Sequence, residues 1–145
     1  MQTSKNDNPL TIRQRASPYL LATATVRTSD LTSEWSTGKN RPLQGKHVKT
    51  LVNVFSLKGL HRSTAENRLL VVASKKDVES MQKVAKFCEN SQVYDFTAWR
   101  SYNLPKLELL AGQHRKAALE AMFSQETDRW WEVEIYDNGM PLQQR

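Results

Sequence analysis

Apolar and polar positions in the last third of the chain follow two different periods. Residues 107–110 form a short apolar run, and residues 114–123 then place small and apolar side chains mostly on one side of a helix. Within residues 130–136, Trp131, Val133 and Ile135 lie on one face of an extended chain and Glu132 and Glu134 on the other. These patterns predict a strand, a helix and a second strand.

The middle of the chain predicts further elements of both kinds. Residues 48–55 are rich in β-branched and aromatic side chains in a partly alternating order, which favours a strand. Residues 58–63 read as a loop, and residues 68–73 form a continuous apolar run that is typical of a buried strand. Residues 92–96 suggest another short strand.

A helix is expected between these strands, over residues 77–90. Ser74 is placed to cap it, and Val78, Met81, Ala85 and Cys88 recur at helical spacing along one face. The resulting order of strands and helices predicts an α+β fold, with a small mixed β-sheet packed against helices.

The first 45 residues lack a sustained apolar period. Residues 1–50 hold 8 Lys and Arg against 3 Asp and Glu, a net charge of +5, whereas residues 51–145 carry a net +1. We therefore expect a disordered basic tail over residues 1–45, a folded domain over residues 46–140, and a short tail over residues 141–145. Within the first tail, a short helix or strand over residues 20–26 is the alternative.

Composition excludes several classes of protein. With Cys88 as the only cysteine, no internal disulfide can form, and the histidines and this cysteine lack the spacing of a zinc site, so no metal site is predicted. No apolar run is long enough to cross a bilayer, and the first residues lack the apolar core of a secretory signal. We expect an intracellular protein, in the cytoplasm or nucleus, with no membrane partner.

The segment with the clearest chemistry is Ala111-Gly112-Gln113-His114-Arg115. A strand that turns at a glycine into a helix presents backbone N–H groups and the positive end of the helix dipole, and both attract phosphate. His114 and Arg115 add donors, and a guanidinium can bind two phosphate oxygens at once. The alternative is an ordinary strand–turn–helix with solvated basic residues.

This segment resembles the signature of the ParB/sulfiredoxin superfamily, a strand followed by Gly-x-[His/Arg]-Arg and a helix with an Ala pair, here Ala117-Ala118. The resemblance is clearest over residues 107–137 and extends more weakly back to about residue 48. It implies a small mixed sheet with helices, and a nucleotide, CTP or ATP with Mg²⁺, whose phosphates lie against Gly112, Gln113, His114 and Arg115.

The same resemblance bears on catalysis. A sulfiredoxin-type reductase needs a cysteine where this chain has Gln113, and Cys88 is expected to be packed in a helix, so that activity is not expected. The related serine kinases have an Asp where this chain has Ala111, and ParB proteins usually have a Glu at the position of Gln113. Nucleotide hydrolysis and phosphotransfer stay open, and no catalytic residue is assigned.

The sequence therefore predicts a nucleotide-binding, phosphate-binding domain. Two alternatives remain: a non-catalytic protein-interaction domain that keeps the fold without a ligand, and nucleic-acid contact through the basic tail. His61 and Arg62 follow a glycine in the predicted loop, where the superfamily often has a basic residue facing the same pocket. A solvated loop is the alternative there.

Overall fold

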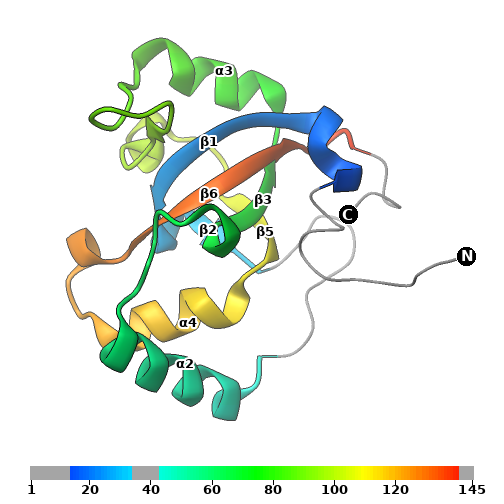
Figure 1. Cartoon of the computed structure of the whole chain (residues 1–145). Coiled ribbons are helices and arrows are strands. Elements are labelled where there is room, and N and C mark those ends of the chain that lie inside the picture. The colour runs from blue at the N-terminus through cyan, green and yellow to red at the C-terminus, as the bar shows by residue number, and fades with distance from the viewer. Residues whose placement is uncertain (1–13, 34–42, 141–145) are drawn as a thin grey trace, which may run out of the picture.

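A six-stranded mixed sheet forms the centre of the computed structural model, which describes residues 14–33 and 43–140 (Figure 1). The strand order is β2-β5-β3-β6-β1-β4. The strands are β1 (Leu20–Arg27), β2 (Leu31–Thr32), β3 (Leu69–Ala73), β4 (Tyr94–Asp95), β5 (Leu107–Ala111) and β6 (Trp130–Asp137). The helices are α2 (Gly45–Lys58), α3 (Lys75–Val84) and α4 (Gln113–Met122). Single turns of 3-10 helix lie at Ser17–Tyr19, Thr28–Asp30, Ala65–Asn67, Trp99–Tyr102 and Glu126–Asp128.

The α+β class with a mixed sheet is confirmed. Strand β6 lies near the middle of the sheet, parallel to β3 and antiparallel to β1. Its alternating pattern holds, because Trp131, Val133 and Ile135 belong to the main core, while Glu132 and Glu134 lie on the other face of the strand. The predicted strand at residues 107–110 and helix at residues 114–123 are β5 and α4.

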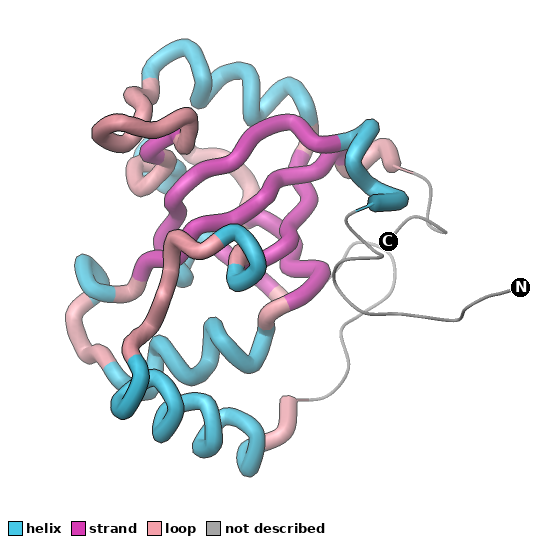
Figure 2. The backbone as a smooth tube through the Cα atoms, viewed as in Figure 1, coloured by secondary structure: helices cyan, strands magenta, loops and turns pink. Residues whose placement is uncertain are grey.

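The expectation of a disordered tail over residues 1–45 is wrong for residues 20–32. Strand β1 pairs along most of its length with β6, and β2 pairs with β5 (Figure 2). Ala22, Ala24 and Val26 are buried in the core and alternate with half-buried residues. This is a period of two, but small alanines supply it, so the hydrophobic signal is weak. Two parts of the expected tail, residues 1–13 and 34–42, lie outside the described residues, as does the tail at 141–145.

The predicted strand over residues 48–55 is also wrong, because this segment is most of helix α2. Val48, Leu51, Val52 and Phe55 pack against the core. Their spacing of three and four residues is that of one face of a helix, and Val54, which an alternating strand would bury beside Val52, is exposed. The β-branched residues favoured a strand by composition, but burial of the helical face outweighs that preference.

Helix α3 begins as predicted but ends earlier. The Ser74 hydroxyl accepts a hydrogen bond from the backbone N–H of Asp77 at 3.1 Å, which confirms the cap. The chain leaves the helix at Ala85, and the segment that follows folds back so that the N–H of Cys88 donates to the carbonyl of Val93. Cys88 therefore lies in a turn, half-buried, and not on the apolar face of a helix.

Helices α2 and α4 lie side by side on one side of the sheet, and α3 lies beyond β1, away from them (Figure 1). Phe55 of α2 reaches the core, where its ring contacts that of Trp131 with centroids 5.6 Å apart. Helix α4 adds the fully buried Ala118 and Leu119. Both helices run in the same direction, so their N-terminal ends lie together, which brings two sequence-distant segments to one place (Figure 1).

Candidate functional site

The start of α4 is built on a glycine that the fold itself requires. Gly112 is the N-cap residue and has a φ of 108°, in the region that L side chains rarely adopt. A Cβ on Gly112 would lie 2.3 Å from Cδ2 of Leu69, a core residue that is 1% exposed. Close packing of the helix start on β3 therefore demands glycine here, without any need for a ligand to approach the backbone.

His114 joins the start of α4 to the start of α2. Its ring stacks on that of His47, with centroids 4.3 Å apart. The backbone N–H of Gln44, the N-cap of α2, donates to Nε2 of His114 at 3.1 Å. That bond requires Nε2 to be an acceptor, so His114 is neutral here with its proton on Nδ1. Burial first, and the neighbouring His47 second, lower the pKa of His114 below its ordinary value.

The two helix starts share an electrostatic character. Neither α2 nor α4 has a side-chain N-cap, and neither has an acidic residue in its first turn. Their macrodipoles point the same way, so two partial positive charges lie together. Lys46 and His47 are exposed in the first turn of α2 and add basic groups. We call residues 44–47 and 112–114 the paired helix starts.

Arg115 makes one hydrogen bond away from the paired helix starts. Its Nη1 donates to the backbone carbonyl of Asn67 at 3.5 Å, and the same carbonyl accepts a hydrogen bond from Nε1 of Trp131 at 2.8 Å. The guanidinium is therefore turned toward the start of β3 and the core. The structure thus brings Gly112, Gln113 and His114 to the paired helix starts, and it gives Arg115 a contact that ties α4 to the sheet.

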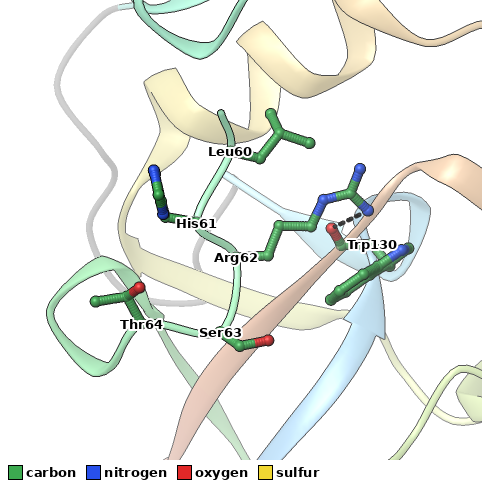
Figure 3. A pocket seen from close by; sticks show the side chains of 6 residues that line it. All are labelled: Leu60, His61, Arg62, Ser63, Thr64 and Trp130. Atoms are coloured by element: carbon green, nitrogen blue, oxygen red, sulfur yellow. Dashed lines mark hydrogen bonds between the residues drawn. The ribbon is translucent and has the colours of Figure 1, made fainter. Parts of the chain in front are cut away.

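The loop that carries His61 and Arg62 lines a separate cavity of about 630 Å³, with Trp130 on its other side (Figure 3). The guanidinium of Arg62 lies 4.3 Å from the centre of the Trp130 ring and donates to the Trp130 carbonyl at 3.4 Å. It also lies 5.4 Å from the ring of Phe123, which follows the C-terminal end of α4. Arg62 is therefore at the opposite end of α4, roughly 15 Å of helix from Gly112. The two basic residues do not face the paired helix starts.

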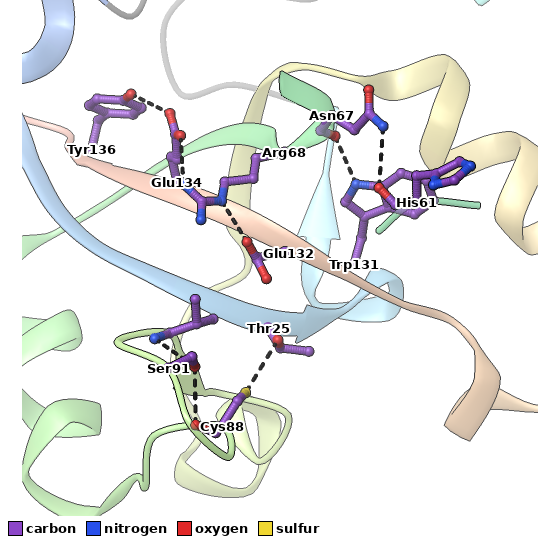
Figure 4. A network of polar contacts seen from close by, with 11 residues as sticks. Thr25, His61, Asn67, Arg68, Cys88, Ser91, Trp131, Glu132, Glu134 and Tyr136 are labelled. Atoms are coloured by element: carbon purple, nitrogen blue, oxygen red, sulfur yellow. Dashed lines mark hydrogen bonds and ion pairs between the residues drawn. The ribbon is translucent and has the colours of Figure 1, made fainter. Parts of the chain in front are cut away.

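Sequence reasoning missed His47 and Gln44, because it read residues 48–55 as a strand and so placed no helix start beside Gly112. It also missed a polar network on the face of β6 that is turned away from α2 (Figure 4). Arg68 donates from Nε to Oε1 of Glu132 at 2.6 Å and from Nη1 to Oε2 of Glu134 at 3.3 Å. The alternation of the two glutamates with apolar residues was the available signal.

Two kinds of feature are absent from residues 14–33 and 43–140. No group of three or more His, Cys, Asp or Glu side chains there is arranged to hold a metal ion. No helix in the same part of the chain is long and apolar enough to cross a membrane.

The chain belongs to the family described as the N-terminal domain of a protein of unknown function, DUF3723, whose model matches residues 20–145. The match includes β1 and β2, so it agrees with the structure that the domain begins well before residue 46. No curated protein matches the chain. No solved structure matches it either.

Proposed function

We propose that this domain binds the phosphate groups of a nucleotide at the paired helix starts. The observation that carries the proposal is the meeting of two parallel helix N-termini that have no side-chain cap and no acid in their first turns. Backbone N–H groups and aligned dipoles at such a position favour an anion. The stacked rings of His47 and His114 offer two further donors once an anion is present.

The likeness of the Gly112–Arg115 segment to the ParB/sulfiredoxin superfamily supports the same ligand class. On that likeness the nucleotide is CTP or ATP, with Mg²⁺ carried on its phosphates. In this proposal His114 and Lys46, rather than Arg115, supply the side-chain contacts to phosphate, because the guanidinium of Arg115 donates to the carbonyl of Asn67. The proposal is binding alone; hydrolysis and phosphotransfer are left to assay.

The test is a thermal-shift screen with CTP, ATP, ADP and GTP, with and without Mg²⁺, followed by calorimetric titration of variants. His114→Ala should weaken binding about tenfold, because it removes a donor to a charged group. Lys46→Ala should weaken it a few-fold, because Lys46 is exposed and water screens its charge. Lys58→Ala is the matched control, since it removes the same charge from the last turn of the same helix. Equal losses for Lys46→Ala and Lys58→Ala would contradict a site at the helix starts.

A protein-interaction role is the second candidate, and it rests on a different surface. Val54 and Leu57 of α2 are 41% and 84% exposed, which is unusual for apolar residues on a helix of a small domain. If no nucleotide shifts the melting temperature, a protein-interaction role is favoured over nucleotide binding. Nucleic-acid contact through the basic N-terminal segment depends mostly on residues outside those described. Deletion of residues 1–13, which leaves β1 in the chain, is its test.

A further inference from the structure

A second cavity, of about 620 Å³, lies over the polar face of β1 and β6, and we call it the sheet pocket. Thr25 and Glu132, which are register partners in the two strands, form part of its floor. Cys88 and Asp95 approach from the segment that follows α3, and Trp130 forms a wall. This cavity is separate from the paired helix starts, because none of residues 44–47 or 112–114 lines it.

The floor of the sheet pocket holds a buried carboxylate that is only half satisfied. Glu132 is 5% exposed, and its Oε1 accepts from Nε of Arg68. Its Oε2 has no hydrogen-bond partner among the described residues, and in Figure 4 the second oxygen points away from Arg68 toward Thr25 and Cys88. A buried carboxylate oxygen that opens into a cavity is a strong acceptor for a donor group on a ligand.

The charges around this oxygen are unbalanced. Arg68 pairs with both Glu132 and Glu134, so two buried carboxylates share one guanidinium among the residues described here. The other charged residues that line the pocket, within the part of the chain described here, are the exposed Glu89 and Asp95. Negative charge in a concave, partly desolvated site favours a cation.

We propose that the sheet pocket binds an organic cation, a guanidinium or alkylammonium group. The cationic head donates to Oε2 of Glu132, and the aromatic ring of Trp130 and the side chain of Val93 offer apolar surface to its methylene groups. The same chemistry is carried by a free small molecule and by an arginine or lysine side chain of a peptide. The half-buried thiol of Cys88 contacts the hydroxyl of Thr25 at 3.6 Å, and Cys88 lines the same cavity.

Cys88 gives a direct readout, because it is the only cysteine in the chain. The rate of its alkylation by iodoacetamide is measured in the full chain with butylguanidinium and with the neutral, similarly shaped butylurea. Butylguanidinium should slow the reaction and butylurea should not. A second comparison uses acetyl-Gly-Arg-Gly-amide and its neutral citrulline counterpart. Stronger protection of Cys88 by the arginine peptide than by butylguanidinium would assign the ligand to a protein side chain.

Variants locate the interaction. Glu132→Gln should weaken protection about tenfold to a hundredfold, because it removes a charged acceptor. The fold should survive, since the amide oxygen can still accept from Arg68 and Glu134 keeps its ion pair. Asp95→Asn, on the exposed rim, should have a smaller effect, and Glu79→Gln, on the exposed surface of α3, should have none. A Cys88 that reacts equally fast with and without butylguanidinium, or equal protection by butylurea, would overturn the proposal. Neither result bears on nucleotide binding at the other site.

Discussion

Gly112 is held in place by two independent constraints, its positive φ and the close approach of Leu69. Gly112→Ala should therefore lower the free energy of unfolding by about 2–5 kcal/mol, the sum of a left-handed backbone cost and overpacking. Gly45→Ala is the matched control, since nothing lies within 4 Å of a Cβ there and it also begins a helix. Urea denaturation of the two variants measures both values. Similar stabilities for the two variants would show that the packing argument is wrong.

His114 reports the electrostatics of the paired helix starts. Burial and the proximity of His47 lower its pKa, so the neutral form is favoured in the folded state. Its contribution to stability is complete above its ordinary pKa of 6.5 and is lost as the pH falls through the lowered value. We predict an NMR titration midpoint for His114 below 6.5, and a rise of that midpoint in His47→Ala. Bound phosphate should raise it as well. A midpoint at or above 6.5 in the ligand-free protein would contradict the observed stacking and hydrogen bond.

At the scale of elements, an ion-pair network adds to the backbone pairing of β3 and β6. Arg68, which directly precedes β3, pairs with the buried Glu132 and Glu134 of β6. Arg68→Met should cost about 3 kcal/mol of stability, because it removes the guanidinium that two buried carboxylates share. This value is at the lower end of the usual range because the Arg68 side chain is 23% exposed. In that variant, burial favours the protonated form of Glu132 and Glu134. The loss of stability should therefore be smaller at about pH 5 than at about pH 8. Urea titrations at both pH values provide the check. A loss independent of pH would mean that the packing of Arg68, and not its charge, stabilises the sheet.

The helices and strands differ in how well the sequence predicted them. Strong single-period patterns gave β3, β5, α4 and β6, and Ser74 gave the start of α3. The pattern of α2 was ambiguous because Val48, Val52 and Val54 favour a strand by type, while spacing and packing make a helix. Residues 20–26 were left open between a short helix and a strand, because the buried positions of β1 are mostly alanine, whose burial is decided by partners far away in the chain. Without α2 and β1, neither the His47–His114 contact nor the sheet pocket could be anticipated.

The whole molecule depends on β1, which lies between β6 and β4 in the sheet. A chain that begins at residue 46 would lack β1 and β2, expose the edge of β6, and remove Ala24 and Val26 from the core. We expect such a truncated chain to lose its cooperative unfolding transition, as followed by circular dichroism, whereas the full chain unfolds in one step. A cooperative transition in the truncated chain would restore the smaller domain first expected over residues 46–140.

The central claim is that the paired helix starts bind phosphate. The most direct measurement is a titration of the ¹⁵N-labelled full chain with the nucleotide that gives the largest thermal shift, followed by two-dimensional NMR. The account predicts that the largest amide shifts fall on residues 45–47 and 113–115, at the first turns of α2 and α4. Amides near Lys58, at the far end of α2, should stay in place. Saturating shifts confined to other parts of the chain, or none at millimolar nucleotide, would contradict the claim.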